Sequence, residues 1–475
     1  MTRTAAIDQG TTSTRVLVAA DDGTSEIKHS IRHGQYRPQP GWVEHDATEL
    51  LTNIRTCIKV GNDAAAPLDA IGLANQGESC LAWDAESGEP LSPVIVWQDN
   101  RTAATIERLR ADGCETVTRE RAGLPLDTYF SASKLAWVLR NMPEAGQAMR
   151  RNRLRLGTTD AYFLDRLTGV FATDVTTASR TSLMNLRTCQ WDGELCRLFG
   201  VPLESLPEIR PSVGSFGDLD GIPMTAAIVD QQAALYGHGC RQAGDAKITF
   251  GTGAFMLAVT GDEVVRVPER GLLPTVAWQI GAGPAVFAVD GGVHDAGATV
   301  EWIHRLGLFT DFAELRDFDA DPAISRGLVF VPALSGLACP HWDRSAAGMW
   351  IGMTANTSRT ELCQAALEGI ALAVSEVVSA IDSSIAIADP LSVDGGLVAS
   401  PYFVQFLADV TGRSIVTRPM NELTAHGCAA LSALGIGHEL PVLRSGTSVY
   451  APREVEAEGW RERYTTAVSR SMRWH

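Results

Sequence analysis

The chain lacks the marks of several protein classes. Its nine cysteines are odd in number, and none of them forms a Cys-x-x-Cys pair. Scattered cysteines of this kind argue against a disulfide framework or a structural zinc site and fit reduced thiols. The sequence contains no run of 18 apolar residues, and its first residues have no apolar signal-peptide core. We therefore expect no transmembrane helix and a cytoplasmic location.

Long basic runs are also missing. The net charge is −16 over 475 residues, with 40 Lys and Arg against 56 Asp and Glu. Because nucleic acids are bound through clustered basic side chains, this composition predicts no nucleic-acid partner. With no apolar span, it also predicts no membrane partner. Neither GxxxxGK[ST] nor GxGxxG occurs, so the sequence has no motif that would indicate a P-loop or a Rossmann fold.

The length and the pattern of the chain favour two α/β domains. A single hydrophobic core rarely organises more than about 250–300 residues, so a chain of 475 predicts two large domains. Near the start, strand-like residues 4–7 and 15–20 enclose a turn rich in Gly and hydroxyl side chains. Helical patterns over 47–60 and 101–112 alternate with strand-like stretches such as 70–74. Such alternation is typical of an α/β fold.

The same plan recurs in the second half. Residues 245–259 read as a strand, a tight Gly-Thr-Gly turn and a second strand, and a long helical pattern follows over 358–381. Small and polar residues precede this second unit. We therefore divide the chain into an N-terminal domain, 1–240, and a C-terminal domain, 241–475. The residues after Pro441 are polar, and we predict that they form a peripheral extension.

Three glycine-containing turns carry the chemistry of phosphate binding. Glycine lets backbone N–H groups face a ligand, and hydroxyl and guanidinium groups add donors for phosphate oxygens. The residues with these properties are Thr11, Thr12, Ser13 and Arg15 in the first turn, Gly251 and Thr252 in the second, and Gly395 and Gly396 in the third. Asp8 ends the first strand, where a carboxylate suits Mg²⁺. One such turn is as often an ordinary polar hairpin, but three at strand ends predict two actin-like (ribonuclease H-like) ATPase domains with ATP in the cleft between them.

Nine long segments of the chain form one ordered set of motifs between residue 8 and residue 431. They are DQGTTSTR (8–15), QPGWVEHDA (39–47), VIVWQDNRT (94–102), GLPLDTYFSASKLAWVL (123–139), LTGVFATDVTTASRTSLMNL (167–186), DQQAALYGHGC (230–240), FGTGAFMLAVTG (250–261), HWDRSAAGMWIGMT (341–354) and TRPMNELTAHGCAAL (417–431). These segments resemble the FGGY carbohydrate kinases, and most closely those members of the family that act on glycerol, so the resemblance covers nearly the whole chain. The resemblance implies an ATP- and Mg²⁺-dependent kinase that phosphorylates a hydroxyl of glycerol or a slightly longer polyol.

The same resemblance implies roles for individual residues. Asp230 matches the catalytic base and, together with Asp8, a ligand of the metal. The residues that match the acceptor site are Glu78, Trp97, Tyr129, Asp230, Gln231 and Phe255. Charged acceptors would hold the hydroxyls of a polyol, and aromatic faces would cover its C–H side. Taken singly, each of these is an ordinary core or surface residue, so the assignment depends on the joint match.

Two positions depart from the pattern of the members that act on glycerol. Gly77 stands where they carry an arginine that contacts the hydroxyls, and Ser400 stands where they carry an asparagine that contacts adenine. Loss of a hydrogen bond to a charged group weakens recognition by about 1.5–3 kcal/mol. We therefore expect either an acceptor larger than glycerol, in the volume vacated at Gly77, or weakly bound glycerol. We also expect Ser400 to bind the adenine base less firmly than the asparagine does.

Three other interpretations stay open on the sequence alone. A ketose kinase of the same family, acting on xylulose or ribulose, would share the phosphate turns. An actin- or Hsp70-like nucleotide switch would share them too, but would bind a protein in place of a small acceptor. A regulator derived from a kinase would bind a polyol without turnover. Family members often form homodimers or homotetramers, and the sequence does not decide between these states.

Overall fold

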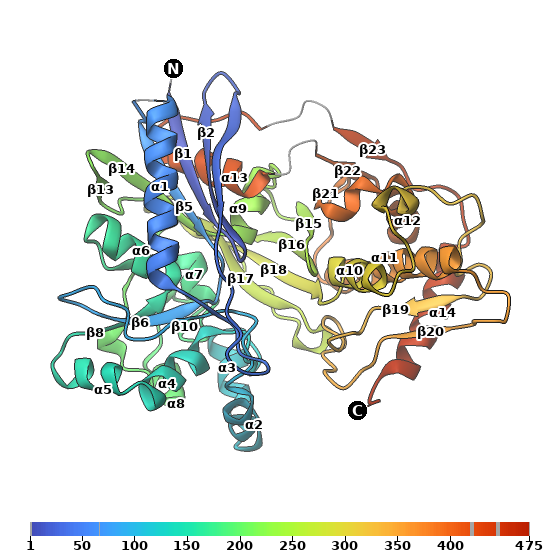
Figure 1. Cartoon of the computed structure of the whole chain (residues 1–475), viewed down its shortest axis with the longest axis horizontal. Helices are drawn as coiled ribbons and strands as arrows, with labels where there is room; N and C mark the ends of the chain where they lie inside the picture. Colours follow the sequence, from blue (N-terminus) through green and yellow to red (C-terminus); the bar gives the residue numbers. More distant parts are fainter. Residues whose placement is uncertain (1, 66, 419–421, 443–446, 475) are drawn as a thin grey trace.

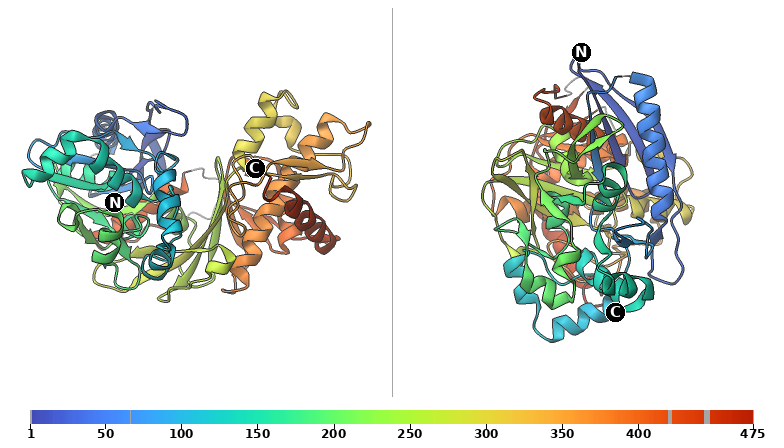
Figure 2. Two further views of the ribbon diagram at one scale, coloured as in Figure 1. Left: turned by 90° about the horizontal axis from the view of Figure 1, so that it is seen from below. Right: turned by 90° about the vertical axis from the view of Figure 1, so that its left-hand side faces the viewer.

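The computed structural model describes residues 2–65, 67–418, 422–442 and 447–474. The chain forms two α/β lobes, one built mainly from each half of the sequence (Figure 1). Each lobe contains a mixed β-sheet, and strands of the second sheet lie between the lobes (Figure 2). The α/β class predicted from the sequence is confirmed. The segment 417–431 includes residues 419–421, which lie outside the described residues.

The first sheet brings the ends of three parallel strands to one edge. In sheet order, its strands are β13 (Asp218–Leu219), β14 (Ile222–Val229), β5 (Ala70–Asn75), β1 (Arg3–Gln9), β2 (Ser13–Ala20) and β3 (Ser25–Arg32). Strands β1, β5 and β14 are parallel, and Gln9, Asn75 and Val229 stand in one row of the register. The loops that follow these three residues therefore leave the sheet at the same edge, where α/β folds bind ligands.

The second sheet repeats this arrangement. In sheet order, its strands are β17 (Leu273–Gln279), β18 (Ala285–Val293), β16 (Ala254–Gly261), β15 (Ala246–Phe250), β21 (Leu391–Gly395), β22 (Ile415–Thr417) and β23 (Ser448–Tyr450). Strands β15 and β21 are parallel, and Phe250 is the register partner of Gly395. The second and third glycine turns therefore begin side by side. The two predicted hairpins, β1 with β2 and β15 with β16, are both antiparallel pairs and are confirmed.

Smaller sheets extend the two lobes. The four-stranded sheet consists of β4 (Glu44–His45), β7 (Val94–Ile95), β6 (Cys80–Asp84) and β8 (Leu154–Thr158). The two-stranded sheets pair β9 (Ala172–Asp174) with β12 (Glu208–Arg210), β10 (Met184–Asn185) with β11 (Gln190–Trp191), and β19 (Val329–Val331) with β20 (Met349–Ile351). The four-stranded sheet matters for the site, because β6 begins two residues after Glu78 and β7 ends two residues before Trp97.

Helices cover the sheets on both lobes. They are α1 (Ala47–Ala65), α2 (Ala103–Ala111), α3 (Glu115–Arg121), α4 (Ser131–Asn141), α5 (Pro143–Arg150), α6 (Thr159–Thr168), α7 (Val175–Ser179), α8 (Gly193–Phe199), α9 (Asp230–Gly237), α10 (Gly297–Arg305), α11 (Arg359–Asp382), α12 (Pro401–Thr411), α13 (Leu423–Gly435) and α14 (Ala457–Ser471). The predicted helix over 358–381 is α11, and it begins with a capping box. The hydroxyl of Ser358 accepts from the N–H of Glu361, whose carboxylate accepts from the N–H of Ser358 at 2.8 Å.

Helix α13 belongs to the second half of the sequence but packs on the first sheet. It contacts β1, β5 and β14 and lies against α9 (Figure 1). The approach to α9 requires glycine, because a Cβ at Gly427 would lie 1.9 Å from the carbonyl oxygen of Ala233. The C-terminal half thus completes the core of the N-terminal lobe. The boundary between residues 240 and 241 stays a prediction.

The tail after Pro441, predicted as a peripheral extension, adds an edge strand and a helix to the C-terminal lobe in its described part. Strand β23 is the edge strand of the second sheet, and α14 packs against the core of the C-terminal lobe. The side chains of Trp460 and Tyr464 are buried there. The composition of the tail is polar because one face of α14 is exposed, while its apolar residues recur at helical spacing on the other face.

Among the described residues, one helix is long and apolar enough to cross a membrane. This helix is α11, and 83% of its most apolar 18-residue stretch is buried inside the protein. A core helix of a large domain has the same composition as a membrane span, because both are surrounded by apolar groups.

Candidate active site

Three cavities meet at the turn between β15 and β16. The inner chamber, about 180 Å³, is lined by all six predicted acceptor residues: Glu78, Trp97, Tyr129, Asp230, Gln231 and Phe255. The nucleotide chamber, about 810 Å³, is lined by the predicted nucleotide residues Gly251, Thr252, Gly396 and Ser400. The outer chamber, about 310 Å³, adjoins the inner one. Thr252 lines all three, so this turn lies where an acceptor and a phosphate would meet.

The first phosphate turn lies only partly at these chambers. Thr11 lines the inner chamber, and its hydroxyl accepts from Nε1 of Trp97 at 3.1 Å. Arg15 points to carboxylates of its own protein: its Nη1 lies 2.5 Å from Glu422 and its Nε 3.7 Å from Asp8. Nη2 of Arg15 donates to the hydroxyl of Ser13 at 3.1 Å. The charge of Arg15 is therefore balanced by carboxylates of the protein itself, and Thr12 is exposed at the tip of the turn.

Asp230 is the first residue of α9 and follows strand β14 directly. One of its carboxylate oxygens accepts from the backbone N–H of Gln231 at 2.7 Å. Burial raises the pKa of Asp230 to about 7, the charges of Asp8 and Glu78 add to this rise, and Lys247 counteracts it. A carboxylate with this pKa can take up a proton near neutral pH, as a general base must.

Asp8 is a buried carboxylate near the end of β1. Burial raises its pKa to about 6, although the positive charge of Arg15 opposes the rise. The pKa values of both Asp8 and Asp230 are raised although Arg15 and Lys247 oppose the shifts, and the charge of Asp8 contributes to the rise at Asp230, so a further cation beside the two carboxylates would be favourable. The described residues contain no group of three or more His, Cys, Asp or Glu side chains that would hold a metal alone. The pair instead fits Mg²⁺, which is held by one or two carboxylates plus phosphates and water.

Glu78 is held in a strained conformation. Its φ of 59° lies in the left-handed region, which non-glycine residues seldom adopt. The backbone oxygen of Glu78 accepts from the hydroxyl of Ser131 at 2.9 Å, and its carboxylate accepts from Nε of Arg180 at 2.6 Å. Burial raises the pKa of Glu78, while the adjacent guanidinium of Arg180 opposes the rise. These contacts fix the direction of the carboxylate, which lines the inner chamber.

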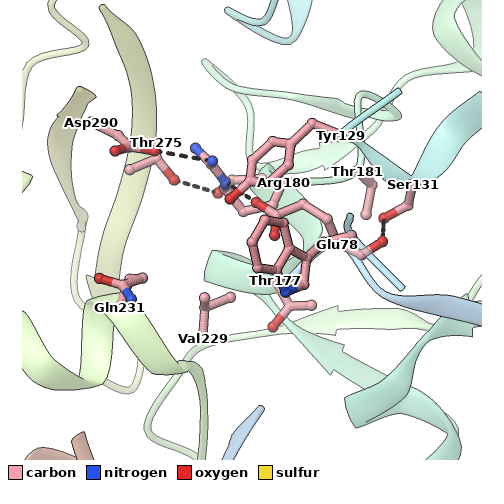
Figure 3. Close-up of polar contacts among 12 residues, drawn as sticks. Glu78, Tyr129, Ser131, Thr177, Arg180, Thr181, Val229, Gln231, Thr275 and Asp290 are labelled. Atoms are coloured by element: carbon pink, nitrogen blue, oxygen red, sulfur yellow. Dashed lines mark hydrogen bonds and ion pairs between the residues drawn. The ribbon is translucent and has the colours of Figure 1, made fainter. Parts of the chain in front are cut away.

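Arg180 is a residue of the site that the sequence did not single out. It caps the C-terminus of α7, and it is buried between Glu78 of the first half and Asp290 of β18 (Figure 3). Its Nη1 is buried and has no hydrogen-bond partner among the described residues, and Arg180 lines the inner chamber. Burial alone would lower the pKa of Arg180, but the two carboxylates more than offset this and raise it. Arg180 lies within the segment 167–186, which was the only signal for it.

Aromatic rings separate the inner chamber from the outer chamber. Trp97, Tyr129 and Phe255 line both. The rings of Trp97 and Tyr129 meet edge to face with centroids 5.7 Å apart, and the guanidinium of Arg180 lies 5.6 Å from the centroid of Tyr129. Trp97 and Phe255 were predicted as the aromatic walls of an acceptor site and Tyr129 as a residue that binds a hydroxyl, and the structure places the three rings together around one cavity.

Gln231 is positioned by a buried lysine that the sequence did not indicate. Nζ of Lys247 donates to Oε1 of Gln231 at 2.5 Å and to the hydroxyl of Thr249 at 2.8 Å. Burial lowers the pKa of Lys247, and the charges of Asp394 and Asp230 oppose the shift. Because the lysine occupies the oxygen of Gln231, the amide N–H groups of Gln231 stay available to a ligand.

Comparison with known proteins identifies the family. Residues 4–237 match the FGGY family of carbohydrate kinases, N-terminal domain, and residues 246–436 match the C-terminal domain of the same family. The chain belongs to the FGGY family of carbohydrate kinases. Its two lobes therefore have the actin-like ATPase fold that the three glycine turns predicted.

Individual relatives match this chain over almost its whole length. It is 40% identical to glycerol kinase from Haloferax volcanii over 99% of its own length and 98% of the relative. It is 41% identical to glycerol kinase from Alkalilimnicola ehrlichii, with the same coverage. The crystal structure of Plasmodium falciparum glycerol kinase with ADP is 32% identical, with a TM-score of 0.91 and 99% and 98% coverage of the two chains. A xylulose kinase from Lactobacillus acidophilus, 21% identical over 98% of this chain and 97% of its own, has a TM-score of 0.87 and shows the shared fold alone.

The space beside Gly77 of this FGGY kinase is not open. A Cβ built on Gly77 would lie 3.2 Å from Cγ1 of Val229, closer than ordinary contact. Val229 lines the inner chamber, so an isopropyl group borders the position where the family pattern carries an arginine. The expectation that a longer acceptor uses a vacated volume at Gly77 therefore has no support from the packing.

The third turn of this FGGY kinase requires glycine, and its serine is already engaged. Gly395 has φ +98°, and a Cβ there would lie 2.2 Å from the carbonyl oxygen of Phe250. Ser400 lines the nucleotide chamber as the N-cap of α12. Its hydroxyl donates to the carbonyl of Leu315 at 2.6 Å and accepts from the N–H of Phe403 at 3.2 Å. The predicted contact between Ser400 and adenine stays a prediction.

Proposed function

We propose that the protein transfers the γ-phosphoryl group of ATP to a terminal hydroxyl of a small polyol, glycerol or a slightly longer one. One observation carries this proposal: Asp230, with a pKa raised to about 7, lines the inner chamber beside the turn at Thr252, which the nucleotide chamber shares. A base, an acceptor cavity and a phosphate turn are therefore contiguous. The glycerol kinases among the relatives support the choice of acceptor.

In this reaction, the proton of the acceptor hydroxyl passes to a carboxylate oxygen of Asp230. The hydroxyl oxygen forms a bond to the γ-phosphorus, and the bond from that phosphorus to its bridging oxygen breaks, which releases ADP. Asp8 and Asp230 would hold Mg²⁺, which neutralises charge on the nucleotide phosphates. Such transfers depend mainly on positioning and charge neutralisation, because the protein has little covalent chemistry to perform.

The acceptor residues orient the polyol. The carboxylate of Glu78, which Arg180 and the strained backbone hold in place, accepts from one hydroxyl. The free amide of Gln231 donates to another, while Trp97 and Phe255 cover the C–H faces. Closure of the two lobes excludes water, which would otherwise hydrolyse ATP. We expect this activity in the cytoplasm.

Replacement of the base tests the proposal. The variant Asp230→Asn keeps the shape of the side chain but cannot accept the proton, so kcat should fall by about 10²–10⁴-fold. The dissociation constant for ADP, measured by calorimetry without Mg²⁺, should change little, since Asp230 does not line the nucleotide chamber. Asp22→Asn, in an exposed turn, is the matched control and should keep full activity. A variant at position 230 that retains a substantial share of the activity would falsify the assignment of the base.

A coupled assay of ADP release across polyols and sugars tests the acceptor. Turnover with glycerol or a longer polyol supports the proposal, whereas turnover only with xylulose or ribulose would reassign the protein as a ketose kinase. ATP hydrolysis that no polyol or sugar alters would indicate a nucleotide switch. Polyol binding in calorimetry without turnover would indicate a regulator derived from a kinase.

A further inference from the structure

The outer chamber continues the inner one past the three aromatic rings. The two cavities share Trp97, Tyr129 and Phe255, and Asp290 lines both. The nucleotide chamber is separate, and Thr252 and Ala298 are the residues of the described chain that line both it and the outer chamber. A ligand that occupies the inner chamber can therefore extend into the outer chamber without entering the space for the nucleotide.

The sizes of the chambers distinguish short acceptors from long ones. An apolar cavity of about 150 Å³ holds benzene, a molecule with six heavy atoms. Glycerol also has six heavy atoms, so the inner chamber, at about 180 Å³, is large enough for glycerol and little more. The outer chamber, at about 310 Å³, is larger than the inner one and would remain unfilled by glycerol.

The outer chamber carries polar groups that suit hydroxyls. His294 lines it, and the Nδ1 atom of this residue is buried and has no hydrogen-bond partner in the described part of the chain. Burial and then the charge of Arg344 lower the pKa of His294 to about 4, so the ring is neutral at pH 7 and offers one donor and one acceptor. Asn100 and Asp127, from the opposite lobe, complete the polar lining.

The charges of the outer chamber favour an uncharged ligand. Arg344 is paired with Asp127 at 3.3 Å. Asp290 is paired with Arg180 at 3.0 Å. Asp295 forms no ion pair within the described part of the chain, although the charge of Arg344 acts on it; its carboxylate accepts from the backbone N–H and the hydroxyl of Ser335 at 2.7 and 3.0 Å. The cations of the chamber are thus already paired and one carboxylate remains, so a second phosphate or carboxylate on the ligand would be repelled.

We propose that the outer chamber binds the distal hydroxyls of an uncharged, linear polyol of roughly four to six carbons, whose terminal hydroxyl lies at Asp230. This inference rests on the proposed kinase function and names the class of its acceptor. The carbon chain passes between Trp97, Tyr129 and Phe255, and the hydroxyls beyond them bind His294 and its polar neighbours. Glycerol occupies only the inner chamber and leaves Nδ1 of His294 without a partner.

The ratio of kcat/KM for a pentitol to kcat/KM for glycerol tests this proposal. Glycerol, erythritol, threitol, xylitol and ribitol are compared, and in the unmodified enzyme at least one longer polyol should exceed glycerol by about tenfold or more. His294→Phe fills the chamber and removes the imidazole, so the ratio should fall by at least about tenfold. His29→Phe, on the edge strand β3, is the control and should leave the ratio unchanged.

A second variant keeps the test decisive if His294→Phe fails to fold. Arg344 is about half exposed at the rim of the chamber, so Arg344→Met should fold, and it should lower the ratio by roughly threefold or more. A preference for glycerol that neither variant alters overturns the proposal and leaves the kinase function standing. A loss of ADP affinity in His294→Phe with an unchanged ratio also overturns it, since the chamber would then serve the nucleotide. No turnover of any polyol contradicts the proposed function itself.

Discussion

Nη2 of Arg180 lies 3.0 Å from Oδ2 of Asp290, and both side chains are almost completely buried. Arg180 ends a helix of the first half of the chain, whereas Asp290 lies on β18 of the second sheet. Because Nε of the same guanidinium donates to Glu78, the ion pair couples the packing of the two halves to the carboxylate that faces the acceptor. Arg180 is therefore a positioning residue for Glu78 whether or not it touches the acceptor.

Replacement of Arg180 should affect stability and acceptor binding together. Arg180→Gln removes the guanidinium that pairs with two buried carboxylates, which costs about 3–5 kcal/mol in the free energy of unfolding. The KM for the polyol should rise more than kcat falls, because Glu78 is no longer held. Urea unfolding and steady-state kinetics measure the two effects, and Arg180→Lys should recover part of both. The matched control is Arg153→Gln, whose ion pairs are more exposed and are screened by solvent, so its loss of stability should be much smaller. Equal losses in the two Gln variants would contradict the role of Arg180.

The rate at low pH should report the protonation of Asp230. Its pKa is raised to about 7 from an ordinary 3.8, so the carboxylate is protonated and unable to act as a base below that pH. With both substrates well below saturation, the rate reflects the free enzyme, and it should fall about tenfold per pH unit below 7 and level off above it. With saturating substrates, this fall in rate should begin at a lower pH, since a bound cation favours the ionised form of Asp230.

Asp8→Asn provides the check on this pH profile. The negative charge of Asp8 is one of the causes that raise the pKa of Asp230. In Asp8→Asn, the fall in rate at acidic pH should therefore begin at a lower pH. The activity itself should also fall, because Asp8 is a predicted ligand of Mg²⁺. If the rate of Asp8→Asn falls at the same pH as that of the unmodified enzyme, a group other than Asp230 titrates.

The sequence predicted those parts of the site that depend on local pattern. The hairpin tip after β1 and the turn after β15 could be placed because glycine and hydroxyl residues interrupt two apolar stretches. The ion pair between Arg180 and Asp290 could not, because neither residue has a local signal and the pairing exists only once the two halves pack. The contact of Val229 with Gly77 was hidden for the same reason: it joins the ends of two parallel strands that are distant in the sequence.

Gly395 and Gly396 should respond differently to alanine. At Gly395, a methyl group would lie 2.2 Å from the carbonyl oxygen of Phe250, in a backbone conformation with φ +98°. We expect Gly395→Ala to cost about 1–3 kcal/mol in unfolding free energy and to weaken ADP binding, because the strand end must move. At Gly396, a methyl group would meet no described atom within 4 Å. The Tm of Gly396→Ala should therefore stay close to that of the unmodified protein. Thermal unfolding with and without ADP distinguishes the two, and similar losses in both variants would contradict the geometry.

The pairing of Gly77 with Val229 predicts a non-additive pair of substitutions. Gly77→Arg would restore the guanidinium of the family pattern, but its Cβ would lie 3.2 Å from Cγ1 of Val229 and could not settle without a shift. Val229→Ala removes that methyl group. We expect the single variant Gly77→Arg to leave the KM for glycerol unchanged or higher, and the double variant to lower it by about tenfold or more.

The size of that gain follows from the chemistry of the inner chamber. A guanidinium donates to a hydroxyl through a charge-assisted hydrogen bond, which contributes about 1.5–3 kcal/mol when its geometry is good. Val229→Ala alone supplies no donor and should change the KM for glycerol little, so the coupling between the two positions is the measured quantity. Effects of the two single variants that simply add would show that Val229 does not obstruct position 77. In that case, the absence of the arginine alone would account for a weak hold on glycerol.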